Sequence, residues 1–194
     1  TSDDFRAAVT GEIRDVLIRS RDPVKLLHDV ADMRRRLARE KPAESPWSLK
    51  QLRGGMVDIE FIIQYLTLKH AADHADILNA NTLGGMDELA KAGVLESGMQ
   101  QRLATALRLW HGLQGMLSLT VEDDITAARV AAFPGALKSR LARIDGAEDF
   151  SALEATLHTT AADIYDIFQT LIEIPAAALP APAGGEEETP VPLI

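Results

Sequence analysis

The feature that most constrains the fold is the segment 56–70, which is apolar on nearly every side. A β-strand is the rival interpretation, because Ile, Val, Phe and Tyr favour strands. Its 15 unbroken residues are too many for a strand, which usually has about 5–6. A helix that is apolar all round has to lie at the centre of a fold. The sequence therefore predicts a buried central helix over 56–70.

The rest of the chain also has the periodicity of helices. Apolar residues recur at steps of three and four, and the pair Asp22-Pro23 is typical of a helix start. No alternating strand pattern and no internal repeat occurs. The predicted fold is all-α, a helical bundle, and its further helices are expected at about 4–19, 23–40, 82–93, 97–117, 134–144 and 151–174.

The C-terminal end has a different composition. Residues 175–194 hold five of the nine prolines, the pair Gly184-Gly185 and three consecutive glutamates at 186–188. Such a composition cannot bury a core. We expect the last helix to stop at Pro175. The predicted organisation is connecting helices over 1–45, a helical bundle over 46–174 and a disordered Pro-rich tail over 175–194.

Charge and composition exclude several classes of protein. The chain has 29 acidic and 20 basic residues, a net charge of -9, which argues against binding nucleic acid or an anionic membrane. Residues 1–50 carry net +2 and residues 51–194 net -11. There is no cysteine, hence no disulfide or thiolate zinc site. With no apolar run of membrane-spanning length and no signal-like start, we expect a cytoplasmic protein.

No complete catalytic constellation is present. The sequence lacks GxxxxGK[ST], GxGxxG and GxSxG, and it has no Asp-x-Asp pair of the kind that holds metal for phosphoryl transfer. We therefore predict no catalytic residue and no metal ligand in this chain. His70 and His74 have the spacing of one helical turn, but position 71 is Ala and not Glu. A solvated helix end is the favoured interpretation there.

A basic cluster, Arg34-Arg35-Arg36 with Arg39, lies within the predicted helix 23–40. The simpler interpretation is a solvated helix face. The functional alternative is a surface for an acidic or phosphate-bearing partner, including another domain of the same protein.

The segment 49–61 contains the most candidate functional residues. Two glycines, Gly54 and Gly55, precede the predicted central helix and permit close approach of another backbone or a phosphate. Lys50 and Arg53 add positive charge. Asp58 and Glu60 lie in or near the first turn, where carboxylates interact well with the helix dipole. Good capping is the simpler interpretation.

A polar line favours a functional site. Glu60, Gln64 and Thr67 are aligned on a helix otherwise too apolar to be exposed, and a buried carboxylate or amide needs partners. The pattern of residues does not specify a reaction.

The string Gly54-Gly55-Met56-Val57-Asp58-Ile59-Glu60-Phe61, with Lys50 before it and Gln64 after it, resembles the signature of the glutamine synthetase adenylyltransferase family. The resemblance covers about residues 10–130, and a weaker form of the string occurs in PII uridylyltransferases. Residues 130–194 depart from the family pattern. Family enzymes carry two nucleotidyltransferase heads, each followed by a helical domain. One half adds AMP to a tyrosine of glutamine synthetase and the other removes it.

The resemblance implies that this chain is a helical domain without its head, inactive alone. The Val57-Asp58 pair and the tail point to the AMP-adding half. ATP and Mg²⁺ would be bound mainly by the absent head. Implied partners are glutamine synthetase, the PII signal protein and that head. A non-catalytic docking or regulatory module, and the equivalent domain of a PII uridylyltransferase, are the alternatives.

The resemblance also implies roles for the residues of segment 49–61 and Gln64. Lys50 and Arg53 would meet phosphates, and Gly54 and Gly55 would allow close approach. Asp58 and Glu60 would orient the lysine, a metal-bound water or nucleotide hydroxyls. The cleft-facing candidates are Lys50, Arg53, Gly54, Gly55, Asp58, Glu60 and Gln64.

Overall fold

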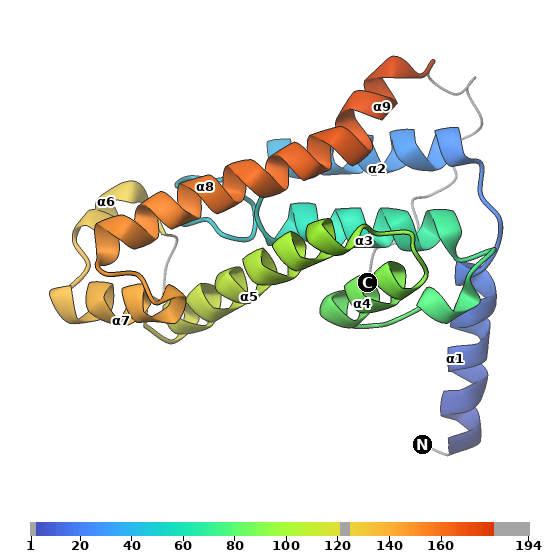
Figure 1. The fold of residues 1–194 in the computed structure, drawn as a ribbon, viewed down its shortest axis with the longest axis horizontal. Coiled ribbons are helices and arrows are strands. Elements are labelled where there is room, and N and C mark those ends of the chain that lie inside the picture. The colour runs from blue at the N-terminus through green and yellow to red at the C-terminus, as the bar shows by residue number, and fades with distance from the viewer. Residues whose placement is uncertain (1–2, 121–124, 181–194) are drawn as a thin grey trace.

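A computed structural model describes residues 3–120 and 125–180, and within these ranges the fold is all-α (Figure 1). The prediction of an all-α fold is confirmed. The helices are α1 (Asp3–Leu17), α2 (Pro23–Glu40), α3 (Met56–His70), the short 3₁₀-helix η1 (Ala75–Ile77), α4 (Thr82–Lys91), α5 (Ser97–Thr120), α6 (Ala127–Ala131), α7 (Gly135–Asp145), α8 (Phe150–Phe168), the π-helical turn η2 (Gln169–Glu173) and α9 (Ile174–Ala178). No membrane-spanning helix is found among these residues.

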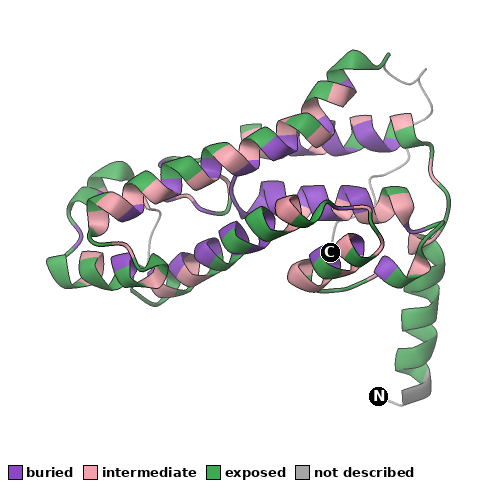
Figure 2. Cartoon of the chain, viewed as in Figure 1, coloured by how far each residue is buried: buried purple, intermediate pink, exposed green. Residues whose placement is uncertain are grey.

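Helix α3 is the central element, as its all-round apolar sequence predicted. It packs against α2, α4, α5 and α8, and Figure 2 shows it buried along most of its length. Ile59 and Ile62 have no exposed surface. The strand alternative is wrong, because 15 residues of continuous helix place apolar side chains against neighbours on several sides.

Local capping sets where several of the other helices begin. The Asp22 carboxylate accepts hydrogen bonds of 2.8 Å from the N–H groups of Val24 and Lys25, which fixes the start of α2. Asn81 and Asp149 cap α4 and α8 in the same way. The predicted starts therefore hold to within one or two residues. The short helix α6 was not predicted.

The predicted stop at Pro175 is wrong. The chain widens into the π-helical turn η2 and continues as α9 to Ala178, with Ile172 and Ala176 buried. A proline lacks an N–H group and clashes with the carbonyl four residues earlier. The wider turn before Pro175 accommodates this defect without ending the helical path. Residues 181–194 of the predicted tail lie outside the described residues.

Helix α1 projects from one end of the bundle (Figure 1). Its apolar stripe exists, but Val9, Ile13 and Val16 are exposed to 41%, 46% and 39%. Helix α2, by contrast, packs against α3 and α9 and contributes Leu27 and Ala31 to the core. The domain boundary expected at residue 45 stays a prediction. This boundary would separate α2 from α3 and α9, which it contacts.

Candidate functional site

The loop over 41–55 wraps closely around the start of α3. The carbonyls of Leu49 and Lys50 accept hydrogen bonds from the N–H groups of Met56 and Val57, at 3.0 and 3.3 Å. Trp47 and Leu49 are only 2% and 1% exposed. The Trp47 ring stacks on the Phe150 ring, with 5.2 Å between the ring centroids. These contacts therefore fix the position of the loop that carries Gly54 and Gly55.

Asp58 is the centre of this arrangement, and it has no exposed surface. Its carboxylate accepts from the guanidinium of Arg34, which is 1% exposed, and from the N–H group of Gly54. Arg53 approaches the same carboxylate at 3.5 Å. Arg34 also donates to the carbonyl of Gln51 at 3.2 Å. A buried charge needs such partners, so Asp58 locks the loop onto α2 and α3.

The two glycines serve close backbone contacts within the chain. Gly54 has φ +78°, and a Cβ there would lie 1.8 Å from the carbonyl oxygen of Ala161 in α8. A Cβ at Gly55 would lie 2.4 Å from the carbonyl oxygen of Leu49. We expected this pair to permit close approach of either another backbone or a phosphate. The geometry shows close approach of another backbone.

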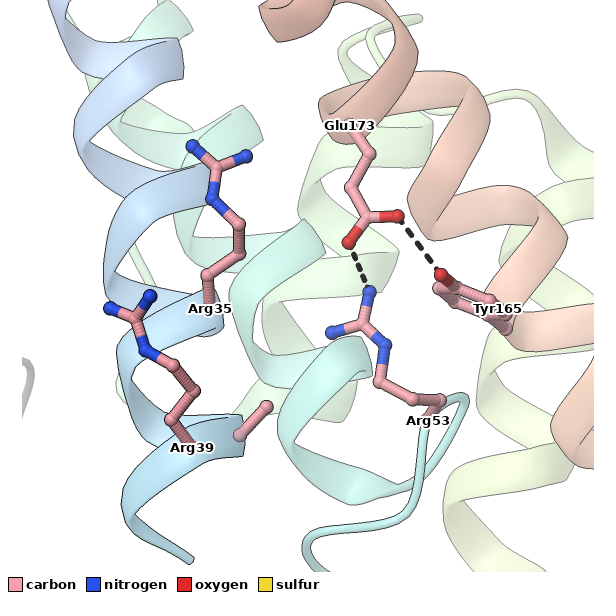
Figure 3. Close-up of a pocket in the computed structure, with 6 residues that line it drawn as sticks. Arg35, Arg39, Arg53, Tyr165 and Glu173 are labelled. Atoms are coloured by element: carbon pink, nitrogen blue, oxygen red, sulfur yellow. Dashed lines mark hydrogen bonds and ion pairs between the residues drawn. The ribbon is translucent and has the colours of Figure 1, made fainter. Parts of the chain in front are cut away.

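Arg53 reaches from the loop to the far end of α8 (Figure 3). Its guanidinium lies 4.4 Å from the ring centroid of Tyr165 and 5.0 Å from that of Phe168, within the range of cation–π attraction. It also pairs with the carboxylate of Glu173, which accepts a 3.1 Å hydrogen bond from the Tyr165 hydroxyl. Arg53 thus joins the loop to η2.

The remaining candidates are differently placed. The Lys50 side chain is exposed, and Glu60 and Gln64 are half-buried on α3. Gln64 Oε1 is buried without a hydrogen-bond partner among the described residues. The structure therefore brings Arg53, Gly54 and Asp58 into direct contact and leaves Lys50, Glu60 and Gln64 outside that network.

The basic cluster on α2 divides into two kinds of residue. Arg34 faces the core, whereas Arg35, Arg36 and Arg39 are exposed, and Arg35 pairs with Asp32. The solvated-face interpretation holds for the exposed three and is wrong for Arg34. Arg34 lies four residues after Val30, so it falls on the apolar stripe of the helix. This spacing was the feature of the sequence that could have predicted its burial.

His70 is the last residue of α3, and His74 directly precedes η1. No group of three or more metal-ligating side chains occurs within 3–120 and 125–180. Burial lowers the pKa of His70 from its usual value, and the neighbouring charges of Lys69 and His74 lower it further.

Glu173 and Tyr165, which complete the arrangement around Arg53, were not predicted. Both lie more than 100 residues from Arg53 in the sequence, so no local pattern indicates that they contact it.

Comparison with known proteins identifies the family. The model of the family described as GlnD PII-uridylyltransferase matches residues 28–172. The match extends past residue 130, where we expected the family resemblance to end. No solved structure matches the chain.

Curated relatives give a second description. The bifunctional glutamine synthetase adenylyltransferase/adenylyl-removing enzyme of Bradyrhizobium diazoefficiens is 42% identical over 89% of this chain. The enzymes of the same name from Rhodopseudomonas palustris strain BisB5 and Xanthobacter autotrophicus are 42% and 37% identical over 88% and 89%. In each case the chain spans 17% of the relative's length. The chain thus belongs to the family described as GlnD PII-uridylyltransferase and is homologous to a segment of glutamine synthetase adenylyltransferases.

Proposed function

We propose that this chain is a helical domain of a cytoplasmic glutamine synthetase adenylyltransferase. It would work beside a nucleotidyltransferase head of the same polypeptide, and support the transfer of AMP from ATP to a tyrosine of glutamine synthetase. The observation that carries the proposal is the homology to a segment making up 17% of such enzymes, over 89% of this chain. The Val57-Asp58 pair favours the AMP-adding half.

The proposal assigns ATP and Mg²⁺ to the head. Asp58, which is fully buried, accepts hydrogen bonds at both carboxylate oxygens from groups of this chain, Arg34 and the N–H group of Gly54. The described residues contain no cluster of ligands for a metal ion. Phosphoryl transfer depends chiefly on positioning and charge neutralisation. This domain would form one rigid side of the cleft in which the head binds ATP. The isolated chain would be inactive.

The contacts within the chain separate supporting residues from those able to reach a partner. Gly54, Gly55 and Asp58 hold the loop together, so replacing them would disturb folding before it disturbed chemistry. Lys50 and Glu60 make no described side-chain hydrogen bond or ion pair within 3–120 and 125–180, and Lys50 is exposed. These two are therefore the residues with which to test contact between this domain and the nucleotide.

The test uses the whole polypeptide that the gene encodes. Lys50→Ala and Glu60→Ala are expected to lower the rate of AMP incorporation into glutamine synthetase by at least about tenfold, since Lys50 would meet the phosphates and Glu60 would orient the lysine, a metal-bound water or nucleotide hydroxyls. Lys91→Ala and Glu148→Ala are matched controls on exposed surface elsewhere. Rates equal to those of the controls would refute the role of the loop in the transfer.

A docking or regulatory module is the second candidate, and the exposed apolar side chains of α1 favour it. It predicts that Val9→Ser and Ile13→Ser weaken binding of the chain to glutamine synthetase or to the PII protein. Sedimentation of the mixed proteins measures this. If the chain binds neither protein, the docking role fails, whereas the transfer assay above decides the first candidate independently.

A further inference from the structure

Four side chains of this chain already engage the guanidinium of Arg53. It forms an ion pair with Glu173 and lies 4.4 and 5.0 Å from the ring centroids of Tyr165 and Phe168. The carboxylate of Asp58 lies 3.5 Å away. Glu173 is fixed in turn, because its carboxylate accepts a 3.1 Å hydrogen bond from the Tyr165 hydroxyl (Figure 3). A cation that is paired and stacked in this way has already lost its side-chain freedom, so its contacts favour a role as an anchor within the fold.

The loop over 41–55 meets one face of α8. A Cβ at Gly54 would lie 1.8 Å from the carbonyl oxygen of Ala161, so the loop backbone touches the helix there. Tyr165 and Phe168 follow Ala161 at spacings of four and three residues, which keeps them on the same face. The end of the loop that carries the glycine pair is therefore seated on α8, and Arg53 extends this contact to η2.

The π-helical turn η2 brings Glu173 to this face. Tyr165 and Glu173 are eight residues apart, and in an α-helix of about 3.6 residues per turn such residues point about 80° apart. A π-helical turn takes up one more residue than an α-helical turn, which brings the two side chains nearly into line. An uninterrupted α-helix would direct Glu173 away from Tyr165, and hence away from Arg53.

The stretch of the loop between Lys50 and Arg53 is held at both ends. The carbonyl of Lys50 accepts a 3.3 Å hydrogen bond from the N–H group of Val57, and the carbonyl of Gln51 accepts one of 3.2 Å from Arg34. At the other end, Arg53 is fixed to η2. The Lys50 side chain is exposed and has no hydrogen bond or ion pair with the residues that the structure describes. The backbone of the loop therefore decides where its ammonium group can reach.

We propose that Arg53 and Glu173 are positioning residues, which fix the loop against η2 and thereby set the reach of Lys50. In this assignment neither residue touches a ligand. Arg53 therefore has a different role from the phosphate contact that the family resemblance implies. The effect on AMP transfer rests on the proposed function, whereas the coupling between η2 and the loop can be measured in the chain alone.

Spin labels measure the position of the loop directly. The chain has no cysteine, so Lys50→Cys and Arg108→Cys, both at exposed positions, provide two specific attachment points. Glu173→Gln keeps the size of the side chain and an acceptor for Tyr165, but it removes the charge that holds Arg53. The distribution of distances between the labels should then broaden, and its maximum should shift.

The matched control for this measurement is Asp163→Asn. It breaks the ion pair with Arg102 on the same helix, α8, where both side chains are exposed. The distance distribution of the labelled chain should stay unchanged in this control. An unchanged distribution in Glu173→Gln, or the same change in both variants, would overturn the proposal.

A double-mutant cycle in the whole polypeptide tests the effect on transfer. Glu173→Gln should lower the rate of AMP incorporation several-fold, but it should have no further effect together with Lys50→Ala, because it acts through that lysine. An equal loss in both backgrounds would mean general damage and would refute the positioning role. If instead Lys50→Ala has the same rate as Lys91→Ala, the proposed role of the loop in the transfer fails, and the spin-label distances still decide the coupling.

Discussion

Replacing Asp58 by Asn tests the central ion pair directly. The substitution keeps the size of the side chain and an oxygen for the N–H group of Gly54, but it removes the negative charge. Arg34, only 1% exposed, is then left as an uncompensated buried cation. Removing one partner of a buried pair costs about 3–5 kcal/mol. Arg53 adds little to this figure, because it lies at 3.5 Å and is 29% exposed.

The expected loss is a large share of the total stability of a domain, which is typically about 5–15 kcal/mol. For a chain of this length it corresponds to a fall in melting temperature of about 6–20 °C. Chemical denaturation of the isolated chain, followed by far-UV circular dichroism, measures it. The matched control is Asp163→Asn, whose partner Arg102 is 46% exposed. Such a surface pair contributes at most about 1 kcal/mol.

Two outcomes separate the explanations. If Asp58→Asn costs no more than Asp163→Asn, the buried pair does not stabilise the loop and the reasoning is refuted. The double replacement Arg34→Met with Asp58→Leu should recover part of the loss, because apolar side chains of similar size can replace a buried ion pair. A double variant as unstable as Asp58→Asn would instead point to the lost bond to Gly54.

Four further substitutions test other parts of the fold, and urea denaturation of the chain measures each. Gly54→Ala should cost about 2–4 kcal/mol, because it combines a positive φ with a clash against α8. Gly93→Ala shares the positive φ but has open space, so a loss near 1 kcal/mol is expected, and equal losses would contradict the clash. Gln64→Met should stabilise the chain by about 1 kcal/mol, since it removes a buried oxygen without a described partner; a loss of stability would mean that water or another group satisfies this oxygen. The pKa of Glu96 lies below its usual 4.5 because two backbone N–H groups at the start of α5 donate to its carboxylate. Its contribution is therefore present above pH 4.5 and lost on acidification, so the stability difference between wild type and Glu96→Gln should shrink as the pH falls, and a constant difference would refute the assignment.

The candidate site shows where reasoning from the sequence stops. The segment around Gly54 and Asp58 stands out because it combines glycines, acids and bases before a helix too apolar to be exposed. That pattern indicated a sheltered carboxylate with partners at Glu60, but the structure gives this environment to Asp58 and leaves Glu60 half-buried outside the network. It could not indicate that the partner is Arg34, from the preceding helix, or that the glycine approaches α8 more than 100 residues later. Such pairings depend on how helices dock, which local periodicity does not encode.

The sequence by itself determined the all-α class, the central place of α3 and the starts of several helices. Each of these follows from short-range rules, namely the period of apolar residues and the hydrogen bonds that a cap can form. Only the tertiary structure decided that α1 turns its apolar face to solvent, that the helical path continues past Pro175, and that Glu173 meets Arg53. These outcomes depend on contacts between residues far apart in the chain, where packing and charge compensation outweigh local preference.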